Sequence, residues 1–459
     1  MITQTRLFAV LLLTMELTFL RGVACSADVS NDLLEKPLTM EEAVIYGLEH
    51  NRSLKASQEN VSSVGQQVTK SRADFFPKID ADYNFRHLND KPFSSLSDPT
   101  LFPAGSPKFQ TGYTDTHHWE IDLKQPIFTG FGLTSQLEIS RMNLDIAKDQ
   151  METTRLDVIR NIKNGFLQTL LGEKLLQVAR DNVESLEVQR GNAQAYFEQG
   201  LTPQNDVLKA DVALADARQR ERTVAKEVAI LRSRLNQLLD LKVSAPIKLV
   251  DVQVRSQNEL PPLESLYSIS EKQRPEYLAV EASIRQAKAG VRLARSRYYP
   301  QVSAFGQYYR EGVDLLGDTN KFTNNENAAI GVRVDLNLFE GGKTRASTNE
   351  LQYRQKSLEE QLLNLKGQLK VEVEDAYEKI QLAKVNIHTS EVAMRQAEEN
   401  ERMTSLQYKN QLVIFLEVLN AQIFLLQSRV NYYQALYGYE LAWSDLERAI
   451  GGPVNSAGK

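Results

Sequence analysis

The sequence predicts an α+β membrane protein in which long helical hairpins are joined to a β-barrel shared between chains. Three observations support this prediction. The chain begins with an export leader, it contains short stretches that alternate apolar and charged residues, and it has two proline-free stretches too long for a globular core. The pattern occurs twice, with Pro77 matching Pro300 and Phe128 matching Phe339. Two internal structural repeats are therefore expected.

The N-terminus predicts a signal peptide over residues 1–24. Arg6 precedes an apolar run at 7–20, and small residues follow it, as in bacterial export signals. Cys25 is a candidate lipid-attachment residue, with ordinary cleavage near Ala27 as the alternative. It is also the only cysteine, so no internal disulfide framework is expected. Beyond the leader no run of about 18 apolar residues suggests a transmembrane helix.

Composition and motifs argue against several classes of function. The formal net charge of −5 disfavours nucleic acid as a partner. The five histidines are scattered without metal-ligand spacing, and His117 and His118, as neighbours on a strand, would point to opposite faces. No nucleophile elbow or phosphate loop occurs. We therefore expect no enzyme activity, no catalytic residue, no cofactor and no metal site.

The first repeat is predicted to span residues 25–240. It opens with a helix in "LTMEEAVIYGLEHN", for which Thr39 is the expected N-cap. The remaining elements follow in chain order: strands at about 78–88 and 117–126, a long helix at about 133–200 and a return helix at about 203–240.

A linker at 241–262 leads into the second repeat, predicted at 263–451, and a tail covers 452–459. The second repeat should contain the same elements in the same order: a helix, strands at about 301–310 and 328–338, a long helix at about 344–410 and a return helix at about 412–450.

The predicted strands have two different faces. In "IDADYNFR", Ile79, Ala81, Tyr83 and Phe85 alternate with polar residues, and "AIGVRVDLNL" repeats the pattern. A soluble sheet with one wet face is the alternative interpretation, but aromatic residues border these strands, as in the girdles of outer-membrane barrels. Four strands cannot close a barrel that needs about eight. We therefore expect a barrel shared between chains, with charges in the lumen and aliphatic residues toward lipid.

Each second strand ends at an aromatic residue followed by glycines. We expect the phenylalanines to anchor at the membrane interface and the glycines to allow an abrupt change from strand to helix. These junction residues are Phe128, Gly130 and Gly132 in the first repeat, and Phe339, Gly341 and Gly342 in the second.

The long helix at 133–200 needs a partner helix, because about 68 residues at 1.5 Å per residue give roughly 100 Å. "EQGLTPQND" predicts its end, with Gly200 as the left-handed terminal residue, Thr202 as the next N-cap and Pro203 as the first helical residue. In the second repeat Gln411 replaces that glycine. The apolar residues Leu412, Ile414 and Phe415 next to it are expected to form either bundle core or a partner surface.

Together these motifs resemble the TolC-like outer-membrane efflux factor family. The resemblance covers about 38–452 and is carried by the following segments: "LTMEEAVIYGLEHNRSL", "PIFTGFG", "NLFEGG", "YFEQGLTPQNDVLKA" and "LQYKNQLVIFLEVLNAQ". It implies a homotrimer with a twelve-stranded barrel in the cell outer membrane, four strands per chain, and a twelve-helix α-barrel in the periplasm. The implied function is a passive exit duct for a tripartite efflux or type I secretion system. The implied partners are a periplasmic adaptor (membrane fusion) protein, an inner-membrane pump and outer-membrane lipid, with small molecules favoured over proteins as cargo.

The resemblance also implies roles for residues near the helical turns. Glu417 stands where the family often has an acidic ring that narrows the pore, and Asp206 is its counterpart in the first repeat. Asn420 replaces a second acid of some relatives, and Val413 replaces a polar gating residue. The adaptor would dock at the two turns, Gly200, Leu201 and Thr202, and Gln411, Leu412 and Val413. Both acids also lie in first helical turns, where the helix dipole favours them whatever their function.

A structural coiled-coil spacer in the periplasm, with no channel, is the alternative function. It would explain the long helices. It would not explain aromatic residues at the ends of two-faced strands.

Overall fold

The computed structural model describes residues 36–95, 107–252 and 260–454. The expected leader at 1–24 and the candidate lipidation residue Cys25 lie outside the described residues. No described helix has both the length and the sustained hydropathy that crossing a bilayer requires.

The described chain is mostly helical and divides into two compact units. The sheet unit contains residues 52–157, 260–377 and 446–454, and the helical unit contains 36–51, 158–252 and 378–445. The helices are α3 (Met40–His50), α4 (Arg52–Ala73), α5 (Gly132–Glu198), α6 (Gln204–Leu238), α7 (Leu263–Gln273), α8 (Pro275–Arg295), α9 (Lys343–Lys409) and α10 (Phe415–Ile450). The strands are β1 (Lys78–His87), β2 (Phe93–Ser95), β3 (Lys108–Gln110), β4 (Asp115–Thr129), β5 (Gln301–Gly312) and β6 (Glu326–Asp335).

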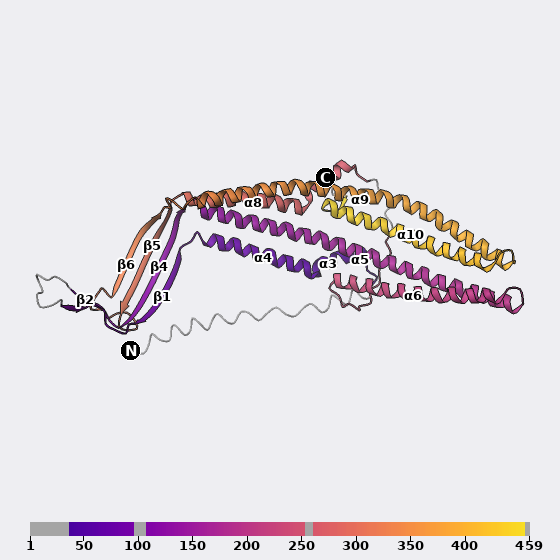
Figure 1. Ribbon diagram of the computed structural model, residues 1–459, viewed down its shortest axis with the longest axis horizontal. Helices are drawn as coiled ribbons and strands as arrows, with labels where there is room; N and C mark the ends of the chain where they lie inside the picture. The colour runs from indigo at the N-terminus through magenta and orange to yellow at the C-terminus, as the bar shows by residue number, and fades with distance from the viewer. Residues whose placement is uncertain (1–35, 96–106, 253–259, 455–459) are drawn as a thin grey trace. The chain divides into compact units, whose positions relative to one another are not determined.

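Four antiparallel strands form the main sheet in the order β1, β4, β5, β6 (Figure 1). β1 and β6 are therefore its two edges. The pairing of β4 with β5 joins strands from the two halves of the chain in one sheet. The ladder is irregular between Pro126 and Phe128, where proline lacks the N–H that a regular ladder needs.

The strand boundaries differ in part from those expected. β4 extends beyond the expected 117–126 at both ends. β6 ends at Asp335 rather than near 338. The side-chain oxygen of Asn337 accepts the Phe339 N–H at 3.2 Å instead, so this segment forms a turn that leads into α9.

A second, two-stranded sheet pairs β2 with β3 in the polar segment after β1. The four strands expected per chain for the barrel correspond to the main sheet, whereas β2 and β3 were not expected. Each of these strands has only three residues. That is too short for apolar and polar residues to alternate detectably, and the sequence pattern therefore missed them.

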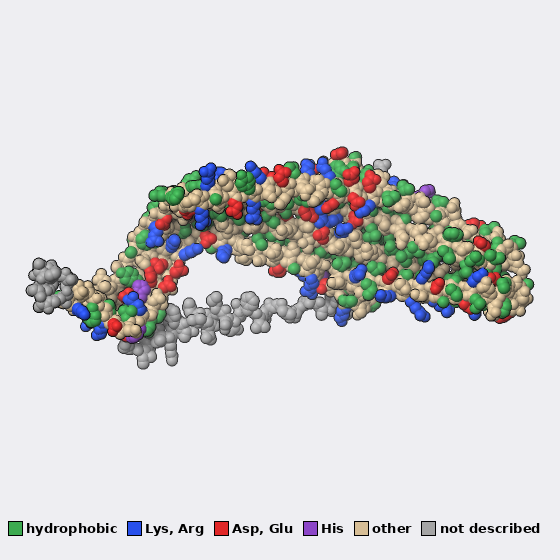
Figure 2. Space-filling view, in the orientation of Figure 1, with side chains coloured by type: hydrophobic (Ala, Val, Ile, Leu, Met, Phe, Trp, Pro, Cys, Tyr) green, Lys and Arg blue, Asp and Glu red, His purple; other side chains and the backbone are tan. Residues whose placement is uncertain are grey.

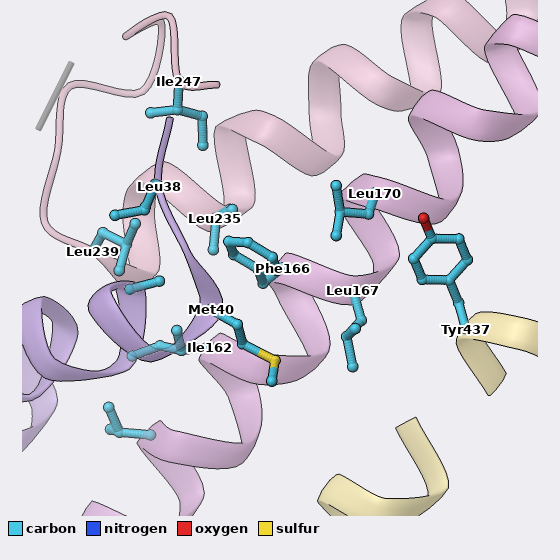
Figure 3. Packing of buried hydrophobic residues seen from close by; sticks show 12 residues of the cluster. Leu38, Met40, Ile162, Phe166, Leu167, Leu170, Leu235, Leu239, Ile247 and Tyr437 are labelled. Carbon is cyan, nitrogen blue, oxygen red and sulfur yellow. The ribbon is translucent and has the colours of Figure 1, made fainter. Parts of the chain in front are cut away.

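The helical unit contains parts of two hairpins, α5 with α6 and α9 with α10 (Figure 1). Its main core includes Ile162, Phe166 and Leu170, which lie one turn apart on α5. They pack with Leu235 and Leu239 at the end of α6 (Figure 3). This burial explains the three- and four-residue spacing of apolar residues along the long helix.

The expected N-cap at Thr39 is confirmed. The Thr39 side chain accepts the Glu42 N–H at 3.3 Å, and the Thr39 N–H donates to the Glu42 carboxylate at 2.9 Å. This capping box satisfies two backbone donors at the start of α3. Leu38, just before it, forms a β-bridge with Leu249 and thereby ties the start of α3 to the segment that follows α6.

The first helix of each repeat is broken into two, where a single helix was expected. The breaks fall at Asn51, between α3 and α4, and at Arg274, between α7 and α8. Arg274 precedes Pro275, and the residue before a proline disfavours helical backbone. Both side chains donate to a carbonyl at the end of a return helix. Asn51 bonds to Leu238 O at 3.0 Å, and Arg274 bonds to Ala449 O at 3.1 Å.

Candidate functional site

The first part of the candidate site is the main sheet, whose two faces differ in chemistry. On one face the paired residues of β1 and β4 are apolar, as in Ile79 opposite Leu123 and Tyr83 opposite Trp119. The face continues across β5 and β6, where Val302 lies opposite Val334, Ala304 opposite Val332 and Tyr308 opposite Ala328. Many of these side chains are exposed, and Ile330 retains 92% of its accessible surface. We call this surface the apolar face.

The opposite, polar face carries acids on facing strands. Asp80 lies opposite Asp122, and Asp82 lies opposite Glu120. His118 lies between Glu120 and Glu311, with nitrogen-to-oxygen distances of 3.3 and 3.2 Å. Figure 2 shows acidic and histidine side chains gathered over the strands.

The two neighbouring histidines point to opposite faces, as expected. His117 hydrogen-bonds to the Tyr83 hydroxyl at 2.7 Å, on the apolar face. Its ring centroid lies 4.9 Å from that of Phe85. Within the described ranges, no three His, Cys, Asp or Glu side chains are grouped so that they could hold a metal ion.

Aromatic rings gather where the strands meet the helices. The Phe131 ring packs edge-on against Phe128 at 5.5 Å and against Tyr299 at 5.8 Å. Phe76, just before β1, and Phe339, just after β6, are exposed. Belts of aromatic side chains of this kind are typical of membrane interfaces.

Both junctions contain two successive residues in left-handed backbone. These are Gly341 and Gly342, with φ of 59° and 85°, and Gly130 and Phe131, with φ of 59° and 68°. A side chain at Gly130 would also come within 2.5 Å of the Ser296 carbonyl. Gly132 also lies at this junction as the first residue of α5, but Phe131 rather than Gly132 takes the second left-handed position.

The second part of the candidate site is the pair of turns where the long helices end. Gly200 and Gln411 have φ of 72° and 60°, which confirms the left-handed position in both repeats. The Leu201 N–H bonds to Tyr196 O, and the Leu412 N–H bonds to Gln407 O, both at 2.9 Å. These six-to-one bonds are those of a Schellman motif.

The return helices begin later than expected. Thr202 is not the N-cap of α6; Pro203 occupies that position in extended backbone, with no side-chain cap. α10 begins at Phe415 rather than at 412. In both repeats the first turn is closed by a backbone bond instead. The Asp206 N–H donates to Pro203 O and the Glu417 N–H to Ile414 O, each at 3.1 Å.

The apolar residues of the second turn divide between core and surface. Phe415 is fully buried. It belongs to a tip core with Val207, Ala210, Tyr408 and Val418. Leu412 and Ile414 remain 73% and 64% exposed.

The two equivalent acids have different surroundings. Asp206 is 9% exposed, whereas Glu417 is exposed and Asn420 half-buried. Val413 packs against the tip core. Burial and the negative charge of Asp206 raise the pKa of Tyr408 to about 12.

No pattern in the sequence predicts a role for Tyr408. Its counterpart in the first repeat is Phe197, which is partly exposed. The only available signal was that Tyr408 carries a hydroxyl group where Phe197 has none.

Comparison with known proteins shows the family to which this chain belongs. The sequence profile of the family described as outer membrane efflux protein matches residues 47–240 and 266–452. The chain belongs to this family. The resemblance stated above is thereby confirmed, and the family is one of transport channels.

Individual relatives match over most of their length. The alkaline protease secretion protein AprF of Pseudomonas aeruginosa is 20% identical, over 89% of this chain and 83% of AprF. The cation efflux system protein CusC of Escherichia coli is 21% identical, over 88% of this chain and 84% of CusC.

Solved structures of family members share the fold. A crystal structure of CusC matches with a TM-score of 0.75 at 16% identity, over 94% of this chain and 96% of that chain. The outer membrane protein VceC from Vibrio cholerae matches with a TM-score of 0.76 at 16% identity, over 90% and 96%.

The protein is therefore an outer-membrane exit channel component of an efflux or secretion system, with a periplasmic extension. The alternative of a spacer without a channel is not favoured.

Proposed function

We propose that three copies of this chain form one passive duct across the outer membrane and the periplasm. The observation that carries this proposal is the sheet with one apolar and one polar face. Its edge strands β1 and β6 have no further partner within the described sheet, and open sheet edges are not viable in lipid. Pairing β1 of one copy with β6 of the next would close a barrel, and three copies would supply twelve strands.

In this assembly the apolar face meets lipid and the polar face lines a water-filled lumen. Residues such as Ile79, Ile121 and Ile330 would contact acyl chains. Asp80, Asp82 and Glu120 would face the passage. Conduction through such a lumen requires no chemical step, so the proposal includes neither a catalytic residue nor a cofactor.

The periplasmic end would be closed by the helical tips. Tyr408 holds the two hairpins of one protomer together, because it packs with Val207 and Ala210 of the other hairpin. Glu417, Asn420 and Val413 would lie near the constriction. The exposed Glu417 is the best candidate for lining it, and Asp206 is buried beside Tyr408.

A periplasmic adaptor would dock on the turns and connect the duct to an inner-membrane pump. The turns are formed by Gly200, Leu201 and Thr202, and by Gln411, Leu412 and Val413. Leu201 and Leu412 occupy equivalent positions and are both exposed. Two apolar side chains per protomer at the extreme tip suit an apolar partner surface.

Small molecules are favoured over proteins as the cargo, by analogy with the family alone. CusC is named for cation efflux, whereas AprF is named for secretion of a protease. The pump, rather than this chain, would choose the cargo.

Electron microscopy of the detergent-purified protein tests the proposal. We expect a hollow particle with threefold symmetry. A solid rod, or a monomer that is stable without detergent, would overturn the duct and support the spacer.

A further inference from the structure

The loop between β5 and β6, residues 313–325, folds back on the end of β5. The Val313 N–H donates to Thr319 O at 3.0 Å. The Thr319 N–H donates to the Asp314 side chain at 2.8 Å. A side chain at Gly312 would come within 2.8 Å of the Gly317 backbone. The loop therefore has a defined conformation held by its own bonds.

Two adjacent leucines point away from this loop. Leu315 and Leu316 are 63% and 62% exposed. Such a pair in a rigid segment is costly in water, because the loop has no freedom to turn both side chains inward. It calls for an apolar environment on the outer side of the loop.

A tryptophan ties the loop to the apolar face. Trp119 Nε1 donates to Leu315 O at 2.8 Å. Trp119 lies on this face because it alternates in phase with Ile121 and Leu123 on β4. β4 is an interior strand, so the bond from Trp119 holds the loop over the interior of the sheet.

The loop also neutralises a cation on the apolar face. Arg310 lies opposite Trp119 in the β4–β5 register. It forms ion pairs with Asp318 of the loop and with Glu326 at the start of β6. An unpaired arginine on a lipid-facing surface is destabilising. The loop acid therefore makes this end of the face compatible with lipid.

We propose that the loop at 313–325 lies against the outer leaflet, with Leu315 and Leu316 among the lipid acyl chains. The loop would extend the apolar face beyond the end of the strands, with Trp119 at the interface where its ring is apolar and its N–H is paired. This inference rests on the proposed function, because it requires the apolar face to meet lipid.

Spin labels can locate the two leucines. Cys25 is the only cysteine, so a Cys25→Ser background accepts a single nitroxide-labelled cysteine at 315 or 316. The reconstituted protein would be measured for collision with oxygen, which concentrates in lipid, and with a water-soluble nickel chelate. Two matched labels calibrate the result, one at 330 on the apolar face and one at 324 in the polar part of the same loop.

We expect labels at 315 and 316 to resemble the label at 330, with oxygen accessibility above nickel accessibility, and the label at 324 to show the reverse. Nickel accessibility at 315 and 316 would place the loop in water and overturn the inference. Low accessibility to both reagents would indicate a protein contact, including a second copy, and would also overturn it. Nickel accessibility at 330 would instead contradict the proposed lipid-facing sheet.

Trp119→Phe tests whether the hydrogen bond from Trp119 to Leu315 O positions the loop, because this variant keeps an aromatic ring but lacks the N–H donor. In this variant the ratio of oxygen to nickel accessibility should fall at 315 and stay constant at 330. The label at 330 thus reports whether the sheet is intact. An unchanged ratio at 315 would show that the Trp119 bond does not position the loop.

Discussion

Tyr408 makes the helical tip sensitive to high pH. Its pKa is raised from 10.0 to about 12, first by burial and then by the charge of Asp206. A raised pKa means that the folded state favours the protonated hydroxyl. Below pH 10 the protonated Tyr408 hydroxyl makes its full contribution to the free energy of unfolding. As the pH rises through 12 this contribution is lost, which lowers the free energy of unfolding by up to about 3 kcal/mol.

We therefore expect the free energy of unfolding to fall more steeply between pH 10 and 12 in the wild-type protein than in Tyr408→Phe. Denaturant titrations of the detergent-solubilised protein at several pH values would measure both. The phenylalanine variant controls for every other group that titrates in this range. Parallel curves would contradict a coupling between the Tyr408 proton and the fold.

Asp206 should restrain the tip more than its exposure alone suggests. Asp206→Ala removes a buried charge beside Tyr408. It should favour an open tip by about 1–3 kcal/mol, the usual cost of disturbing a buried polar group. Conductance in planar bilayers should rise. Asp211→Ala is the matched control, because Asp211 lies on the same helix but pairs with Arg190 at the surface, and it should leave conductance unchanged.

Gly200 and Gln411 occupy equivalent left-handed positions with different residues. Glycine takes this conformation without steric strain, whereas a residue with a side chain is strained by roughly 1 kcal/mol. Gln411→Gly should therefore raise the stability of the tip, and Gly200→Ala should lower it, each by about 1 kcal/mol. Hydrogen exchange at neutral pH, read on residues of the two turns, would measure both. Changes of the same sign would contradict the argument.

At the scale of helices and strands, equivalent ends are held by different chemistry in the two repeats. Asn51 caps α6 through a neutral hydrogen bond to Leu238 O. Arg274, which is buried, caps α10 and also pairs with Glu276 and Glu372 at 3.0 and 2.9 Å. Arg448 on α10 also bonds to Asp157. The second repeat therefore relies on a charged network where the first uses an amide.

Arg274→Met should destabilise the sheet unit by about 3 kcal/mol, because it removes a buried cation that bonds to the partly buried Glu276 and to a helix-end carbonyl. Asn51→Ala should cost the helical unit only about 1 kcal/mol. Thermal unfolding in detergent would compare the two. Glu372→Gln is the control, since Glu372 is exposed and its loss should cost little. An Arg274→Met variant as stable as Asn51→Ala would show that the network contributes nothing beyond the cap.

At the scale of the whole molecule, the proposed orientation of the sheet in the membrane predicts which of its faces tolerates an added charge. Ile330→Lys places a charge on the apolar face and should destabilise the inserted form by about 2–4 kcal/mol near the bilayer centre. Asn327→Lys places the same charge on the polar face of the same strand and should be tolerated. The amount of each variant recovered in the outer-membrane fraction would distinguish them. Equal recovery would contradict the assigned faces.

Much of this molecule could be predicted from its sequence because many of its features are local. The strand faces follow from a period of two, and the hairpin ends follow from Gly200 and its counterpart Gln411. The candidate site was less predictable. Asp206 and Glu417 occupy the same place in their repeats, yet only Asp206 is covered by neighbouring side chains. No sequence period predicts that difference, because burial depends on how the helices pack.

Patterns among neighbouring residues were enough to predict the two-faced strands, the long hairpins and the family, because periodicity and turn chemistry are local. Only the tertiary structure decided that Tyr408 shares a core with Val207, that Arg274 caps α10, and that the loop after β5 is tied to Trp119. Each of these pairs is separated by more than 150 residues. Their contacts are set by how whole helices and strands pack, so no local pattern could have predicted them.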